Sequence, residues 1–168
     1  MLGNLKILEH NWRKLTMMID YFKLRDNVLD PVRANPSDAG LDVFYCPPDD
    51  RDSVRIDPGQ SLVLETGLKF GVPHGFMLEV KNRSSMASKR RLIVGACVID
   101  PGYDGELYIN LINIGNHSQI IENGSKIAQV VMIPVIHFRA RKIMTDTLYN
   151  SNICISNRGS GGFGSTGD

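Results

Sequence analysis

Residues 95–106 read Gly-Ala-Cys-Val-Ile-Asp-Pro-Gly-Tyr-Asp-Gly-Glu, and this stretch decides the fold class of the chain. An apolar run ends in Asp100, Pro101 and Gly102 supply turn chemistry, and Tyr103 follows three residues after the carboxylate. The pattern is typical of two strands of a hairpin that carry a carboxylate and an aromatic ring at their turn. The competing interpretation is an aspartate that only caps the turn and a tyrosine that only packs.

Outward from this segment, most of the chain repeats the pattern of short apolar or β-branched runs separated by turns. The expected strands are 19–24, 41–45, 54–56, 61–64, 68–70, 75–80, 92–99, 107–113, 118–121 and 127–136. Only residues 84–91 are expected to form a helix, and it is short. Many short strands at regular spacing predict an all-β sandwich, jelly roll or barrel.

The length of 168 residues suits one domain of ordinary size, flanked here by two different ends. Residues 1–17 form a leader whose apolar positions recur every three or four residues, as in an amphipathic helix. A helix that docks on the domain and an appended segment remain equal alternatives for it. Residues 18–140 are expected to form the β domain, and residues 141–168 a C-terminal arm that ends in a glycine-rich lid.

Composition excludes several classes of function. Hydrophobic residues make up 42% and charged residues 22% of the chain, and the formal net charge is +1. We therefore expect a globular protein without the basic surface that binds polymeric nucleic acid. The most apolar stretch, 127–136, is interrupted by Gln129 and Pro134, so no membrane span is expected.

The three cysteines are widely spaced and odd in number, which suits reduced thiols and a cytoplasmic location, in a host cell if the protein is viral. They are Cys46, Cys97 and Cys154. We expect neither a disulfide nor a zinc site.

Three further segments carry residues suited to phosphate and metal chemistry. Residues 82–87 place Arg83, Ser84 and Ser85 where a strand gives way to a helix, an arrangement that suits an anion but equally an ordinary serine N-cap. Residues 124–129 place Gln129 inside an apolar run, where its amide needs a partner, either a ligand phosphate or the protein itself. Asp42, at the start of a strand, suits a hydrated divalent cation or a turn.

The last eleven residues, Arg-Gly-Ser-Gly-Gly-Phe-Gly-Ser-Thr-Gly-Asp from 158 to 168, cannot build a core because they lack apolar area. Arg158 can grip phosphate oxygens with its fork of donors, and Phe163 can stack on a flat base. The competing interpretation is a flexible Gly/Ser terminus.

These five segments, in this order, resemble the five motifs of the trimeric dUTP pyrophosphatase (dUTPase) family, and the likeness runs from about Ile19 to Asp168. The resemblance implies a distorted β jelly roll with one short helix, a flexible C-terminal arm, and a homotrimer with active sites shared between subunits. It also implies hydrolysis of dUTP to dUMP and pyrophosphate with Mg²⁺, which lowers dUTP and supplies dUMP for thymidylate synthesis.

On the phosphate side, the resemblance assigns Asp42 to Mg²⁺, held through water. Arg83, Ser84 and Ser85 correspond to the second motif on the triphosphate, and Gln129 to the fourth-motif phosphate ligand. Many family members have glycine where this chain has Ser85.

On the nucleoside side, Asp100 would hold the 3′-hydroxyl and position the attacking water. Tyr103 would pack on the deoxyribose, where a 2′-hydroxyl would clash. Backbone groups around Cys97 and Tyr108 would read the uracil edge. Many members have asparagine where this chain has Val94, which leaves uracil recognition to the backbone.

In the arm, Arg158 would clamp the γ-phosphate and Phe163 would cover the uracil, with Gly164 beside it in the substrate-binding set. Two other functions remain open. The dCTP deaminases share this fold, but they place a glutamate where this chain has Asn110 and an arginine where it has Val98. A nucleotide-binding regulator could use the same pocket, with the leader engaging a partner protein.

Overall fold

The computed structural model describes residues 17–49 and 51–148. The chain divides into two compact units, Met1–Ile136 and His137–Asp168. The described part of the first unit contains these strands and one helix: β1(Asp20–Lys23), β2(Leu41–Phe44), β3(Ser53–Ile56), β4(Ser61–Glu65), β5(Leu68–Gly71), β6(Phe76–Lys81), α2(Ser84–Arg90), β7(Leu92–Val94), β8(Val98–Ile99), β9(Tyr108–Asn113), β10(Gln119–Glu122) and β11(Lys126–Pro134). In the second unit, residues 137–148 form neither strand nor helix.

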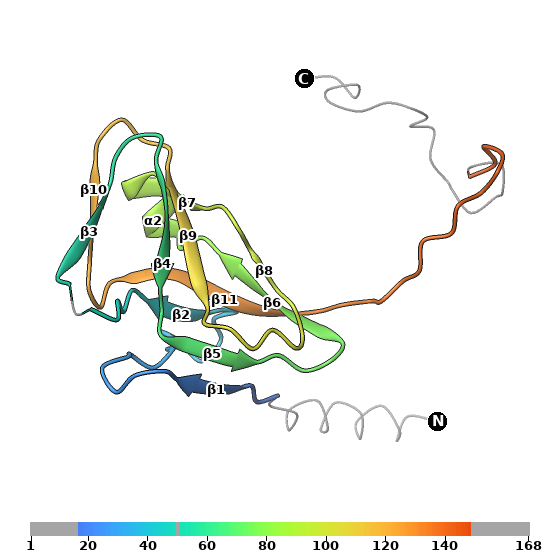
Figure 1. Cartoon of the computed structure of the whole chain (residues 1–168), viewed down its shortest axis with the longest axis horizontal. Coiled ribbons are helices and arrows are strands. Elements are labelled where there is room, and N and C mark those ends of the chain that lie inside the picture. Colours follow the sequence, from blue (N-terminus) through green and yellow to red (C-terminus); the bar gives the residue numbers. More distant parts are fainter. Residues whose placement is uncertain (1–16, 50, 149–168) are drawn as a thin grey trace, which may run out of the picture. The chain divides into compact units, whose positions relative to one another are not determined.

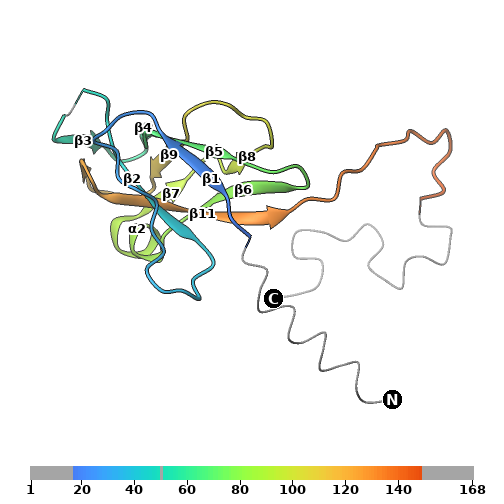
Figure 2. The same cartoon turned by 90° about the horizontal axis from the view of Figure 1, so that it is seen from below.

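The strands form small antiparallel sheets around one core, which confirms the all-β jelly-roll expectation (Figure 1). One sheet has the order β2-β11-β6-β8 and a second the order β4-β9-β7, and β10 pairs with β3. The β1–β5 pair lies at the lower edge in Figure 1, and its β1 strand faces the viewer in Figure 2. All expected strands except 92–99 are present to within two residues at either end. The division at residues 18 and 140 stays a prediction.

The core follows from the alternation along these strands. In β9, Ile109 and Leu111 are fully buried, whereas Tyr108 at the start of the strand is exposed. Both sheets contribute side chains of this kind, including Val43 and Ile127 from the first sheet. Because inward-facing residues alternate with outward-facing ones, each strand can bury one face and present polar groups on the other.

The expected single strand 92–99 is wrong, because the chain changes sheets at Gly95. Residues before it form β7, which pairs with β9, whereas residues after it form β8, which pairs with β6. A Cβ atom at Gly95 would lie 2.0 Å from Oδ1 of Asn110, so glycine leaves room for the Asn110 side chain in its observed position. The hairpin expected within 95–106 is wrong for the same reason, since β8 pairs with β6 and not with the strand that follows it.

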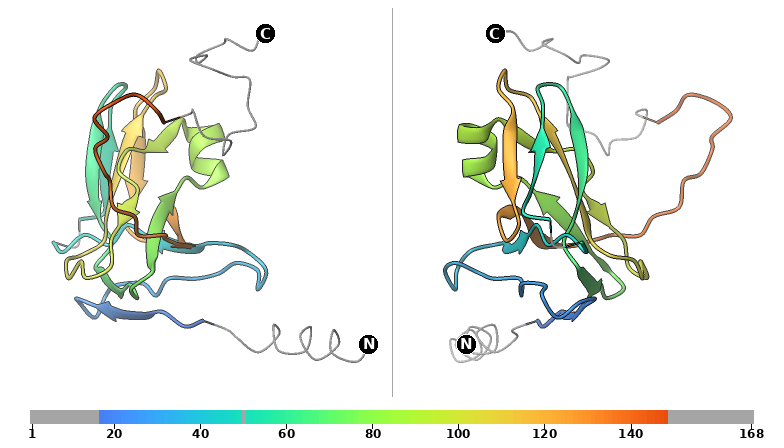
Figure 3. Two further views of the ribbon diagram at one scale, coloured as in Figure 1. Left: turned by 90° about the vertical axis from the view of Figure 1, so that its right-hand side faces the viewer. Right: turned by 60° about the vertical axis from the view of Figure 1, so that its left-hand side comes forward.

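The expected helix is confirmed as α2, which follows β6 directly (Figure 3). Arg83, not a serine, occupies the N-cap, and no side chain caps the helix, so the serine N-cap interpretation is wrong. Arg91 ends the helix in the left-handed conformation with φ 58° and donates its N–H to the Met86 carbonyl. Among residues 17–49 and 51–148, no helix is long and apolar enough to cross a membrane.

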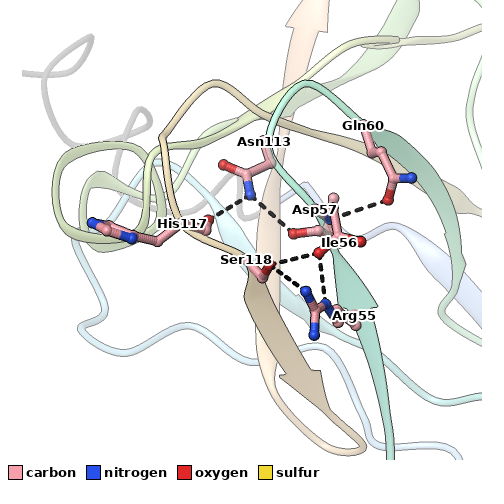
Figure 4. Close-up of polar contacts among 7 residues, drawn as sticks. All are labelled: Arg55, Ile56, Asp57, Gln60, Asn113, His117 and Ser118. Atoms are coloured by element: carbon pink, nitrogen blue, oxygen red, sulfur yellow. Dashed lines mark hydrogen bonds and ion pairs between the residues drawn. The ribbon is translucent and has the colours of Figure 1, made fainter.

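A polar network joins the β3–β4 turn to the β9–β10 loop (Figure 4). The fully buried Asn113 donates from Nδ2 to the carbonyl oxygens of Ile56 and His117, each at 2.9 Å. Asp57 accepts hydrogen bonds from the Ser118 hydroxyl at 2.5 Å and from Nε of Arg55 at 2.6 Å. The loops at this end of the domain are therefore fixed by side chains as well as by strand pairing.

Candidate active site

Three residues distant in the sequence meet at the start of α2. The Asp42 side chain is 12% exposed, and each of its carboxylate oxygens faces one cation. Arg83 Nε lies 2.9 Å from Oδ1, and Lys126 Nζ lies 2.9 Å from Oδ2. Lys126 also lies over the Phe44 ring, 5.8 Å from its centroid. Two cations and one carboxylate leave a net charge of +1, which favours an anion at this point.

Gln129 stands beside this group because it pairs directly with Asp42 across β2 and β11. Its Nε2 donates to the Asn82 carbonyl at 3.0 Å, so the amide has a protein partner although it is only partly buried. A Cβ atom at Gly40 would lie 2.5 Å from Gln129 Oε1, so only glycine leaves room for this side chain. We call Asp42, Arg83, Lys126 and Gln129 the basic cluster.

The donor set of the basic cluster fits Mg²⁺ only through water and substrate. Asp42 is its one carboxylate, and both carboxylate oxygens already face cations. Over residues 17–49 and 51–148, no group of three or more His, Cys, Asp or Glu residues could hold a metal ion. Mg²⁺ commonly keeps several waters and binds one or two carboxylates together with substrate phosphates, which is the arrangement that Asp42 permits.

Ser84 and Ser85 open α2 directly after Arg83, which places both serines at the edge of the basic cluster. Ser84 is exposed and Ser85 partly buried. The Ser84 carbonyl accepts the Ser88 hydroxyl at 2.7 Å, a contact within the helix. Both residues therefore border the place where a phosphate would meet Arg83.

A second group of predicted residues lines a cleft of about 470 Å³, a volume in the range of small-ligand sites. The lining residues are Val98, Ile99, Asp100, Pro101, Gly102, Tyr103, Glu106 and Tyr108. The Tyr103 hydroxyl donates to the Glu106 carbonyl at 2.9 Å, and its ring fills the space that a Cβ atom at Gly105 would need. We call this the nucleoside cleft.

Asp100 lies exposed at the nucleoside cleft, where its backbone carbonyl accepts the Tyr103 N–H at 3.3 Å. Within the described residues, its carboxylate makes neither a hydrogen bond nor an ion pair. Cys97 is exposed next to the cleft, and its carbonyl accepts the Val80 N–H at 2.8 Å. The carboxylate of Asp100 therefore faces solvent and any ligand rather than the protein.

The pKa of Tyr108 is raised above the ordinary tyrosine value. The largest cause is the negative charge of Glu106, and the second is the partial burial of the Tyr108 phenol. Tyr103 and Tyr108 are each 45% exposed. Two aromatic side chains thus line a cleft that also presents a carboxylate, and the nucleoside assigned to these residues stays a prediction.

Two residues of these clusters escaped the sequence analysis. Lys126 belongs to the segment that the sequence analysis selected because of Gln129. The positive charge of Lys126 next to an apolar run was the signal that could have identified it. Glu106 accepts the Gly67 N–H, 39 residues away, and no local pattern reveals that contact.

The two clusters lie far apart within one chain. Asp42 is on β2 and Asp100 follows β8, and these strands form opposite edges of the four-stranded sheet (Figure 1). Gln129 pairs with Lys81 of β6, whereas Ile99 pairs with Leu78 of the same strand. Gln129 is thus offset from Ile99 by roughly 10 Å along β6 and by two strand spacings of about 4.8 Å across the sheet, and Asp42 lies one strand farther away.

Sequence comparison assigns the chain to a family. A model of the dUTPase family matches residues 26–167. The chain belongs to the dUTPase family. Among dUTPase relatives, the deoxyuridine 5′-triphosphate nucleotidohydrolase of Crocosphaera subtropica is 33% identical over 155 residues, covering 90% of this chain and 99% of the relative. The Bartonella bacilliformis protein of the same name is 37% identical, covering 82% and 81%.

Solved dUTPase structures share the fold. The Staphylococcus bacteriophage 80alpha dUTPase with dUpNHpp superposes with a TM-score of 0.76 at 26% identity, covering 91% of this chain and all of that one. A phage phi11 dUTPase mutant, described with a structural Mg(II) ion, reaches 0.68 at 23% identity, covering 77% and 98%. The dUTPase arm residues Arg158, Phe163 and Gly164 lie outside the described residues, as does most of the leader.

Proposed function

We propose that this protein hydrolyses dUTP to dUMP and pyrophosphate. The observation that carries the proposal is the match to dUTPases over residues 26–167. The nucleoside cleft and the basic cluster supply complementary halves of a nucleotide site. Removal of dUTP and supply of dUMP for thymidylate synthesis, in the cytoplasm, follow as its role.

The active site is shared between subunits of a homotrimer. The separation of the two clusters supports this assembly, because Asp42 and Asp100 belong to strands at opposite edges of one sheet. A symmetric assembly can bring the nucleoside cleft of one subunit to the basic cluster of the next. Residues 158–168 of a third subunit would then close the site, with Arg158 on the γ-phosphate and Phe163 and Gly164 over the base.

In the reaction, the oxygen of a water molecule bonds to the α-phosphorus, the bond from that phosphorus to the bridging oxygen breaks, and pyrophosphate leaves. Asp100 holds the 3′-hydroxyl and orients this water, whose proton is released. Arg83, Ser84, Ser85 and Gln129 bind phosphate oxygens, so that charge is neutralised by groups already in position.

Bound Mg²⁺ would supply further positive charge to the phosphates, and Asp42 would hold it through water. On the nucleoside side, Tyr103 packs on the deoxyribose, and backbone groups of Cys97 and Tyr108 read the uracil edge. The formal net charge of the whole chain is only +1, so we expect positive charge at this site alone and no binding of polymeric nucleic acid.

The proposed activity is tested by incubating the protein with Mg²⁺ and each deoxynucleoside triphosphate and measuring pyrophosphate and ammonia. We expect pyrophosphate from dUTP alone. Ammonia from dCTP would instead identify a deaminase, and an absence of pyrophosphate from dUTP would refute the proposal. Asp100→Asn should abolish pyrophosphate release while it retains nucleotide binding.

The shared site is tested by mixing two inactive variants, Arg83→Ala and Asp100→Asn, under conditions that exchange subunits. An equal mixture should recover about a quarter of wild-type activity, because each mixed trimer has one site of three that combines an intact basic cluster with an intact cleft, and about three quarters of randomly assembled trimers are mixed. A site built within one chain would recover nothing.

A second candidate function is regulatory. The phage 80alpha dUTPase is described as one of the phage dUTPases that control transfer of virulence genes. This chain would bind dUTP as a signal and engage a protein partner. Asp100→Asn, loaded with dUTP, separates the two functions, because a regulator would keep its partner while hydrolysis is lost.

A further inference from the structure

Glu106 connects the nucleoside cleft to the interior of the domain. Its side chain is 10% exposed, and Oε1 accepts the Gly67 N–H at 2.6 Å. The same oxygen lies 3.6 Å from Nη2 of Arg25, which also donates to the Cys46 carbonyl at 2.8 Å. Gly67 has φ 71°, and a Cβ atom there would lie 2.1 Å from Val28, so this turn packs closely against the domain and requires glycine.

The backbone next to Glu106 is fixed to the same turn. Leu107 donates its N–H to the Leu68 carbonyl at 2.7 Å, and its own carbonyl accepts the Thr66 hydroxyl at 2.6 Å. The Glu106 side chain therefore completes a clamp that attaches the cleft loop to the β4–β5 turn. A nearly buried carboxylate is costly to leave unpaired, and here one N–H donor and one cation stabilise it, so the clamp is strongly specified.

Both tyrosines of the cleft depend on this residue. The main-chain carbonyl of Glu106, which the clamp holds in place, accepts the Tyr103 hydroxyl at 2.9 Å and so fixes the direction of that ring. Tyr108 follows two residues later, and its phenol responds to the Glu106 charge more than to any other group. Tyr103 and, on the adjacent strand, Glu65 are the other titratable groups that act on the Tyr108 phenol.

We infer that Glu106 is a positioning residue that holds Tyr103 against the sugar and thereby sets the preference for deoxyribose over ribose. The inference rests on the proposed function, in which Tyr103 packs where a 2′-hydroxyl would clash. Without the clamp, the loop can move away from the sugar, so the ring no longer excludes UTP.

The test compares kcat/KM for dUTP and UTP in Glu106→Ala, Glu106→Gln and Tyr103→Phe, with the exposed Glu122→Gln as the matched control. Glu106→Ala should lower the dUTP-to-UTP ratio about tenfold, mainly through KM. Tyr103→Phe removes only the hydroxyl that donates to the main-chain carbonyl of Glu106, so it releases the ring without touching the clamp, and it should also lower the ratio. Glu106→Gln keeps an oxygen acceptor for Gly67 and should retain most of the preference.

Phenolate absorbance supplies a readout that does not depend on activity. Glu106→Gln should lower the pKa of Tyr108, identified as the transition missing in Tyr108→Phe, because a negative neighbour is removed. A wild-type ratio in both Glu106→Ala and Tyr103→Phe would overturn the inference, as would an unchanged Tyr108 transition in Glu106→Gln. Wild-type protein that leaves dUTP intact would refute the proposed function instead, while the titration would still test Glu106.

Discussion

Asp42 and Arg83, from two separate motifs, meet in an ion pair with Arg83 Nε 2.9 Å from Asp42 Oδ1. Because the nearly buried Asp42 carboxylate holds Nε, the remaining N–H donors of the Arg83 guanidinium already point in a fixed direction before any ligand binds. This arrangement reduces the side-chain entropy that phosphate binding must overcome.

Lys126→Met should raise KM for dUTP about tenfold with a smaller change in kcat. The substitution removes one of the two cations on Asp42 and lowers the net charge of the basic cluster from +1 to zero. Steady-state kinetics check this, and Lys126→Arg, which keeps the charge, is the matched control. A variant with wild-type KM would show that Lys126 acts only in folding.

Asn113→Ala should lower the free energy of unfolding by about 2–3 kcal/mol, because it removes a buried side chain that donates to the carbonyl oxygens of Ile56 in β3 and His117 in the β9–β10 loop. Urea denaturation measures the loss. Asn116→Ala, in the same loop but exposed, serves as the control and should change stability by less than about 0.5 kcal/mol. Equal effects of the two substitutions would argue against the network in Figure 4.

Asp57→Asn should destabilise the protein at neutral pH but not in acid. The hydrogen bond from Ser118, and next that from Arg55, lowers the pKa of Asp57 below its ordinary value. A lowered folded-state pKa contributes stability above the unfolded value of about 3.9, and that contribution disappears as the pH falls through the folded pKa. Melting temperatures of wild type and variant, measured from pH 7 to pH 2, should therefore converge at the acid end.

Deletion of residues after Asn157 should leave a folded trimer but lower kcat/KM for dUTP on the order of 10²–10³-fold, because Arg158 and the lid are lost. Size-exclusion chromatography and pyrophosphate release check the two parts of this prediction. Ser165→Ala, which keeps the arm complete, is the control. Unchanged hydrolysis in the truncated protein would remove the role assigned to the arm.

The sequence predicted strand positions well because alternation and turn residues are local signals. It failed at Gly95, where the choice of partner strand depends on Asn110 and on β6, both distant in the chain. Through the resemblance of its motifs, the sequence assigned Asp42 and Arg83 to the same function. It did not predict that Lys126 also contacts Asp42. Contacts that are set by sheet order are invisible to any short window of residues.

The offset between the basic cluster and the nucleoside cleft has a consequence for how variation in this protein is judged. A substitution that only loosens the contact between subunits would be scored as a catalytic defect, although every reacting group is intact. Conversely, in the proposed trimer, selection for hydrolysis would act directly on the surface between subunits. In such a protein, the residues of the active site and the residues between subunits would have to change together during evolution.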